Sequence, residues 1–143
     1  MRLYLDTSAL VKLYVEEEGS VVVRKAVDEA ETIAISIVGY VEARAGFARR
    51  HREKGISLLD HRRIIRNLDS DWERYLIIQT TDALIRRAGK LAEAHNLRAY
   101  DAIHLASAII LRQRLADTLS FASWDSQLQA AARREGLDLV HIR

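Results

Sequence analysis

The sequence predicts a three-layer α/β domain with a central parallel sheet. Short segments rich in β-branched and aliphatic residues, which are typical of strands, alternate along the chain with helix-length segments. In the helix-length segments, apolar residues recur about every 3.6 positions. Strands that alternate with helices favour a parallel sheet whose two faces are both covered by helices.

Five segments are predicted to be strands, and the stretches between them have helical spacing. One example of that spacing is the series Leu84, Ala88 and Leu91. The chain has no proline, and its six glycines are scattered, so no linker or repeat divides it. We therefore expect residues 1–143 to form a single domain, with strands at residues 2–6, 32–36, 75–79, 118–122 and 139–142.

Composition narrows the class of protein. Hydrophobic residues make up 49% and charged residues 29% of the 143 residues, a balance typical of a globular domain and not of a disordered chain. The absence of cysteine excludes disulfides, thiolate catalysis and zinc fingers. Because the sequence shows neither a signal-peptide pattern nor an apolar run of about 20 residues, we expect a cytoplasmic protein. The net charge of +2 is a weak indication of a polyanionic partner.

Four acidic residues fall where a parallel sheet would bring them together. Asp6 ends the first predicted strand, and Asp125 directly follows the fourth. Asp101 opens a predicted helix, and Glu42 lies about two turns into the helix after the second strand. Sites in parallel sheets form beyond the carboxyl ends of the strands. We therefore expect the three aspartates at one edge of the sheet, with Glu42 leaning over it.

Each of these acids also has a purely structural interpretation. Aspartate is a preferred N-cap residue, and Asp101 and Asp125, taken singly, fit a cap better than a ligand. Asp82 has the same local context and is interpreted as a cap. Asp6 fits both interpretations equally well. Glu42 lies beside an apolar helix face, and it is either a solvated residue at the edge of that face or a carboxylate with a specific partner.

Taken together, four carboxylates favour a divalent metal site. Carboxylates gathered in one place repel one another unless cations neutralise them. Oxygen ligands without His or Cys select Mg²⁺ or Mn²⁺ over zinc. These ions suit phosphodiester hydrolysis, because they activate water and neutralise charge on the scissile phosphate and the leaving oxygen.

Four segments resemble the PIN-domain family, and within it the VapC toxins of VapBC toxin–antitoxin pairs. The resemblance covers essentially the whole chain and implies an α/β/α fold with a parallel sheet. The segments are DTSALVKLY at 6–14, VEA at 41–43, YDAIHLA at 100–106 and SWD at 123–125.

This resemblance also implies a function and a set of partners. It implies an Mg²⁺- or Mn²⁺-dependent endoribonuclease that acts as the toxin of a type II pair, with RNA as substrate. A VapB-like antitoxin and a homodimer are further expectations; candidate dimer contacts are Leu10, Leu13, Tyr14 and residues 37–41. A housekeeping nuclease of RNA maturation and a catalytically silent binding module are the alternatives. The catalytic and metal-binding residues would be Asp6, Glu42, Asp101 and Asp125.

Several neighbouring residues are secondary candidates. Ser8 and Ser123 lie two residues from Asp6 and Asp125, where a hydroxyl can orient a carboxylate, although a helix cap is the favoured interpretation of Ser123. Arg98 could bind an RNA phosphate or face solvent. His104 shares a helix face with Asp101, but we do not expect it to be a metal ligand. The basic run at residues 49–52 ends a helix, where complementing the helix dipole is the favoured interpretation. A wider RNA-binding surface is the alternative, with Arg44, Arg49, Arg62, Arg63 and Arg66 as its candidates.

Overall fold

A computed structural model describes residues 1–140 and confirms the predicted parallel sheet. The sheet has the order β3-β2-β1-β4-β5, and every neighbouring pair of strands is parallel. Each of the first four strands lies inside its predicted range. The fifth begins one residue earlier than predicted, and part of its predicted range falls outside the described residues. The strands are β1 (Arg2–Leu5), β2 (Thr32–Ser36), β3 (Leu76–Ile78), β4 (Leu119–Ala122) and β5 (Asp138–Leu139).

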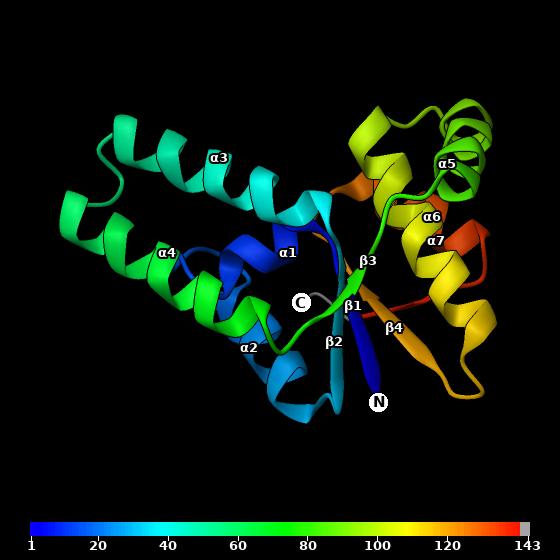
Figure 1. Ribbon diagram of the computed structural model, residues 1–143, viewed down its shortest axis with the longest axis horizontal. Coiled ribbons are helices and arrows are strands. Elements are labelled where there is room, and N and C mark those ends of the chain that lie inside the picture. Colours follow the sequence, from blue (N-terminus) through cyan, green and yellow to red (C-terminus); the bar gives the residue numbers. More distant parts are fainter. Residues whose placement is uncertain (141–143) are drawn as a thin grey trace.

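Helices cover both faces of the sheet, which confirms the three-layer α/β/α architecture (Figure 1). One layer contains α1 (Thr7–Lys12), α2 (Ser20–Glu29), α3 (Val38–Arg52) and α4 (Leu58–Trp72). The opposite layer contains α5 (Asp82–His95), α6 (Ala99–Arg114) and α7 (Ser126–Arg134). In the first layer, α3 and α4 form an antiparallel pair that extends well beyond the sheet (Figure 1).

Strand β1 is the centre of the core because its side chains alternate between the two faces. Leu3 and Leu5 pack with the α1–α4 layer, whereas Tyr4 packs with the α5–α7 layer, and all three are fully buried. Tyr4 stacks on Phe121 of the neighbouring strand β4, with ring centroids 5.5 Å apart. The first strand is thus a fixed platform from which the next residue, Asp6, emerges.

The strand order places a topological switch point beside β1. The chain first winds outward through β2 and β3, then crosses to the other side of β1 for β4 and β5. The carboxyl ends of β1 and β4 are joined by a 3.1 Å hydrogen bond, in which the Asp6 N–H donates to the Ala122 carbonyl. Crevices at such points are the usual ligand sites of open parallel sheets.

Helix starts show where capping was predicted correctly and where it was not. Asp6 caps α1, and Asp125 caps α7. The interpretation of Asp82 as a cap was wrong: the Thr81 hydroxyl accepts the Leu84 N–H at 3.2 Å, and Asp82 lies within the first turn of α5.

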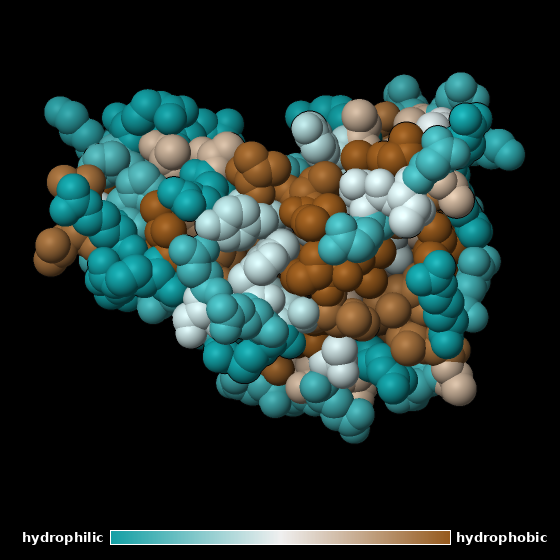
Figure 2. Space-filling model, viewed as in Figure 1, coloured by the Kyte–Doolittle hydropathy of each residue, from teal (hydrophilic) through white to brown (hydrophobic). Residues whose placement is uncertain are grey.

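The outer surface carries both charged and apolar regions. Figure 2 shows apolar residues gathered around β3 and the start of α3. Among the exposed apolar side chains there are Ile37, Val41 and Leu76, of which Val41 is 60% exposed. Within residues 1–140, no helix has the length and apolar character needed to span a membrane.

Candidate active site

All four predicted acids line one groove of about 740 Å³ at the carboxyl edge of the sheet. Asp6 is the most buried of them, at 2% exposed. One of its carboxylate oxygens accepts the Ala9 N–H at 2.9 Å and the Ser8 hydroxyl at 2.7 Å. Asp6 therefore caps α1 and lines the groove, so its two interpretations are compatible.

Asp101 and Asp125 enter the groove from the opposite layer. Asp125 accepts the Leu128 N–H at 2.8 Å, which makes it the N-cap residue of α7. Helix α6, in contrast, begins at Ala99 with Arg98 as its N-cap residue. Asp101 therefore lies in the first turn and is not a cap, contrary to the interpretation favoured for it in isolation. Within residues 1–140, no hydrogen bond reaches its carboxylate.

Burial and neighbouring charges shift the pKa values of two of the groove aspartates, Asp6 and Asp101. Burial raises the pKa of Asp6 above its usual value, although hydrogen bonding to Ser123 and Ser8 acts in the opposite direction. Burial also raises the pKa of Asp101, and the negative charges of Asp125 and Asp6 raise it further. The groove therefore contains carboxylates whose charged forms are disfavoured, and a bound cation would relieve this cost.

Glu42 is held differently from the aspartates. One of its oxygens, Oε1, accepts the Thr7 hydroxyl at 2.7 Å and lies 2.8 Å from His104 Nε2. Burial alone would raise the pKa of Glu42, but the hydrogen bonds from His104 and Thr7 outweigh it and lower the pKa. The second interpretation of Glu42, a carboxylate with specific partners, is therefore the one that the structure supports.

The kind of donor atoms in the groove suits Mg²⁺ or Mn²⁺, but their side chains are not yet arranged around an ion. The groove offers carboxylate oxygens, which are the donors that these ions prefer. A bound ion would also offset the repulsion that Asp101 experiences from Asp125 and Asp6. Over the described range, however, no three acidic or histidine side chains already stand in a geometry that would hold a metal ion. Binding an ion would therefore require the carboxylates to converge.

The two predicted hydroxyl residues contact the aspartates beside them. Ser8 donates to Asp6 and accepts the Trp124 N–H at 3.0 Å, which links α1 to the segment after β4. Ser123 is 2% exposed, and its hydroxyl accepts the Asp125 N–H at 3.0 Å. The helix-cap interpretation of Ser123 was wrong, because Asp125 caps α7.

Basic side chains line the same groove. Arg98 is exposed beside Asp101 and partly offsets the rise in the pKa of that carboxyl. Of the predicted arginine surface, only Arg49 lines the groove, since most of the other arginines lie on α4. Over residues 1–140, three groove arginines form no ion pair: Arg49, Arg52 and Arg98.

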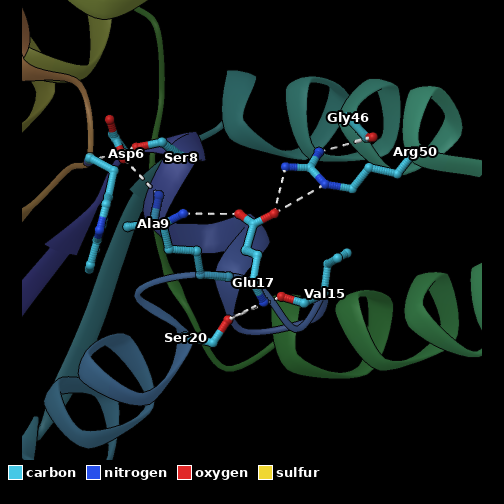
Figure 3. A network of polar contacts seen from close by, with 10 residues as sticks. Asp6, Ser8, Ala9, Val15, Glu17, Ser20, Gly46 and Arg50 are labelled. Carbon is cyan, nitrogen blue, oxygen red and sulfur yellow. Dashed lines mark hydrogen bonds and ion pairs between the residues drawn. The ribbon is translucent and has the colours of Figure 1, made fainter. Parts of the chain in front are cut away.

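Two further cations in the groove are neutralised by Glu17, which the sequence did not reveal. Glu17 lies in the loop between α1 and α2, and Figure 3 shows its carboxylate between α1 and α3. It accepts Lys12 Nζ at 3.0 Å and Arg50 Nη2 at 2.9 Å. The Ser20 hydroxyl fixes the loop by accepting the Glu17 N–H at 3.0 Å. This carboxylate joins the loop to two helices at the groove wall.

Replacing Glu17 with Gln should destabilise the protein by about 1–2 kcal/mol at neutral pH, because two partly buried cations lose their counter-ion. Burial alone would raise the pKa of Glu17, but hydrogen bonds from Lys12 and Arg50 hold it below its usual value. A lowered pKa stabilises the fold above the unfolded-state pKa, and the gain is lost as pH falls through the folded-state value.

Thermal melts from neutral to acidic pH test this prediction. The difference between the wild type and Glu17→Gln should shrink as the pH falls through the titration of Glu17. The exposed neighbour Glu18 is the matched control, since Glu18→Gln removes the same charge without breaking an ion pair within the described residues. Equal melting temperatures for both variants would contradict the proposed role of the Glu17 contacts.

Residues 3–141 match the PIN domain family. This chain belongs to the PIN-domain family. This PIN-domain chain is 32% identical over 133 residues to Ribonuclease VapC45 of Mycobacterium tuberculosis (strain CDC 1551 / Oshkosh). The aligned region covers 93% of this chain and 90% of the relative. The chain has the same identity and coverage with Ribonuclease VapC49 of Mycobacterium tuberculosis (strain ATCC 25618 / H37Rv).

A solved structure supports the same PIN-domain fold. The chain superposes with a TM-score of 0.69 on a protein in a toxin-antitoxin complex from Klebsiella pneumoniae, at 19% sequence identity. The match covers 99% of this chain and 98% of the other. The predicted family and architecture are therefore confirmed, and the roles of the individual site residues remain predictions.

Proposed function

We propose that this PIN-domain protein is a metal-dependent endoribonuclease and the toxin of a type II toxin–antitoxin pair. The observation that carries the proposal is the gathering of four carboxylates in one groove at the switch point of the sheet. The names of the two mycobacterial relatives, which are ribonucleases, support RNA as the substrate.

The acids have distinct places in the proposed mechanism. Asp6, Asp101 and Asp125, with Glu42 beside them, would hold Mg²⁺ or Mn²⁺ through carboxylate oxygens. When bound, the ion supplies Lewis-acid activation of water and neutralises charge on the scissile phosphate. Ser8 and the first turn of α1 fix Asp6, so its orientation is set before substrate arrives.

The unpaired arginines would bind the RNA backbone on either side of the scissile phosphate. Arg49 and Arg52 lie seven and ten residues beyond Glu42 on α3, or about 10 and 15 Å along the helix axis. Arg98 lies on the other wall, next to Asp101. The RNA strand would thus run along α3 away from the sheet, with its scissile phosphate at the acids.

Replacing both Arg49 and Arg52 with Gln should weaken RNA binding and its dependence on salt. For single strands, each neutralised phosphate contributes about 0.7 to the slope of log affinity against log salt, so the slope should flatten by about 1.4. The measurement is fluorescence anisotropy of a labelled single-stranded RNA over a KCl series, in an Asp101→Asn background that prevents cleavage. The matched control is Arg62→Gln with Arg66→Gln, two exposed arginines of α4 outside the groove. Equal slopes for the two double variants would contradict this path.

A VapB-like antitoxin is the proposed regulatory partner, and its binding would block the groove. The Klebsiella protein with this fold was solved in a toxin-antitoxin complex. The test is to express the protein alone and together with its upstream neighbour, measuring growth, RNA cleavage and co-purification. We expect toxicity alone and rescue with a co-purified partner. A harmless protein with no co-purified partner would favour a housekeeping nuclease of RNA maturation.

We also propose a cytoplasmic homodimer, although its predicted contacts need correction. Leu10 cannot be a contact, because it is fully buried in the core, and Leu13 and Tyr14 are only partly exposed. Ile37 and Val41, from the other predicted region, are exposed and remain candidates. Light scattering at micromolar concentration should give the mass of a dimer, and a monomer mass would refute the proposal.

A further inference from the structure

His104 lies at the centre of a buried hydrogen-bonded chain that ends on Glu42. It is 1% exposed, and both of its ring nitrogens have partners. Nδ1 lies 2.8 Å from the Tyr4 hydroxyl, and Nε2 lies 2.8 Å from Glu42 Oε1. The Tyr4 hydroxyl also accepts the Ser36 N–H at 3.1 Å. The chain therefore connects β2, β1, α6 and α3 in one path that leads from the core to the groove.

The donors and acceptors give this path a direction. The Ser36 N–H can only donate, so the Tyr4 oxygen accepts it, and the Tyr4 O–H is available to donate to Nδ1 of His104. The ionised Glu42 carboxylate can only accept, so Nε2 of His104 must carry a proton. Neither ring nitrogen then has a lone pair free for a metal ion, which agrees with the expectation that His104 is not a ligand.

Both donors to Glu42 bind the same oxygen. His104 Nε2 and the Thr7 hydroxyl reach Oε1, and within residues 1–140 no hydrogen bond reaches Oε2. One carboxylate oxygen is therefore anchored while the other stays available. An unanchored glutamate would instead spread over several rotamers.

Close packing brings α3 near this histidine. Gly39 lies three residues before Glu42, on the same side of the helix. A Cβ at Gly39 would come within 2.6 Å of Ile35 Cδ1 and 3.9 Å of His104 Cε1. The first turn of α3 can approach β2 this closely only because residue 39 has no side chain, and this approach fixes the helix that carries Glu42.

We propose that His104 is a positioning residue that fixes the Glu42 carboxylate for metal binding, with Tyr4 orienting the imidazole from behind. The inference rests on the proposed function, in which Glu42 helps to hold the ion. Partners that orient a metal-binding side chain in this way typically change metal affinity or activity 10–100-fold when they are replaced.

Two amide substitutions separate positioning from packing. In His104→Gln the side-chain amide reaches about as far as Nε2, so a donor to Glu42 can be kept. In His104→Asn the amide reaches only about as far as Nδ1, so a partner for Tyr4 can be kept while the donor to Glu42 is lost. Both variants remove a buried imidazole, and Asn is the smaller side chain and the poorer helix former in α6, so thermal melts of the two variants measure the packing loss separately from metal affinity.

Calorimetric titration with Mn²⁺ alone, together with RNA cleavage, tests the proposal on the 143-residue chain. We expect His104→Asn to lower Mn²⁺ affinity about 10–100-fold and His104→Gln to lower it clearly less. Equal losses in the two variants would overturn the proposal, as would a wild type that does not bind Mn²⁺. If the wild type binds Mn²⁺ and the variants differ as expected but no RNA is cleaved, the proposed function fails while the role of His104 stands.

A spectroscopic measurement on the wild type gives a readout independent of metal and RNA. Long-range ¹H–¹⁵N correlation at neutral pH distinguishes a protonated from an unprotonated ring nitrogen. We expect a proton on Nε2 of His104, donated to Glu42. An unprotonated Nε2 would overturn the proposal even if the protein cleaves RNA.

Discussion

Asp101→Asn should abolish RNA cleavage and leave the fold intact. The substitution replaces a negatively charged carboxylate in the groove with a neutral amide of almost the same shape. Electrostatic stabilisation by a bound metal is worth several kcal/mol, and each 1.4 kcal/mol is a factor of ten, so cleavage should fall by at least about three orders of magnitude. Wild-type cleavage by the folded variant would contradict the assignment of Asp101.

The same variant should be at least as stable as the wild type when metal is absent. Burial and the charges of Asp125 and Asp6 raise the pKa of Asp101, so the native state binds more protons than the unfolded state in the pH range above the usual pKa. Wild-type stability therefore falls as pH rises through that range. The advantage of Asp101→Asn in thermal melts should be largest at neutral pH and shrink on acidification.

Asp82 offers a matched control for both effects. Like Asp101, it lies in the first turn of a helix, but it is exposed, pairs with Arg86 and lies outside the groove. Asp82→Asn should leave cleavage unchanged. A loss of activity in this control as large as that in Asp101→Asn would show that the effect does not come from the groove.

Removal of divalent metal should also abolish cleavage. EDTA in excess should reduce the rate to background, addition of Mg²⁺ or Mn²⁺ should restore it, and Zn²⁺ should support it poorly, because the donors in the groove are carboxylate oxygens. Initial rates on a labelled RNA measure this directly. Undiminished cleavage in EDTA, after contaminating nucleases have been excluded, would contradict the metal site.

Metal should stabilise the wild type in the same conditions. Ligand at one hundred times its dissociation constant adds about 2.7 kcal/mol to the free energy of unfolding. The melting temperature of the wild type should therefore rise with Mn²⁺, and that of Asp101→Asn should rise less. This measurement requires no RNA, and thus separates a failure of metal binding from a failure of the proposed substrate.

The architecture could be predicted from the sequence because strands and helices are marked by local residue patterns. Strand β1 is bounded by Asp6, and its alternating side chains fill both halves of the core, as a buried strand requires. The predicted last strand was less accurate, since β5 is a short edge strand with a weak pattern. Cap residues were predicted less well. Asp82 was predicted to cap α5, but the cap is Thr81, one residue earlier, and a sequence pattern does not locate the start of a helix more precisely than this.

The candidate site was only partly predictable, for a related reason. The three aspartates could be found because each follows a strand or begins a helix, and the topology then brings them to one edge, where Glu42 joins them from within α3. Their partners are distant in the sequence: Thr7 and His104 meet Glu42 across 35 and 62 residues. Glu17 meets Arg50 across 33 residues, and no periodicity connects such positions. Lys12 and Glu17 are five residues apart, whereas side chains that meet on a helix surface are three or four residues apart, so this contact could not be predicted from spacing either.

The groove is proposed to bind a catalytic divalent ion between its carboxylates. Anomalous scattering from crystals grown with Mn²⁺ tests it most directly, because the ion is located without reference to activity. We expect a peak bounded by oxygens of Asp6, Asp101 and Asp125, with Glu42 beside it, and metal–oxygen distances of about 2.0–2.2 Å. A groove without a peak at saturating Mn²⁺, or a peak only at histidines outside it, would contradict this metal site.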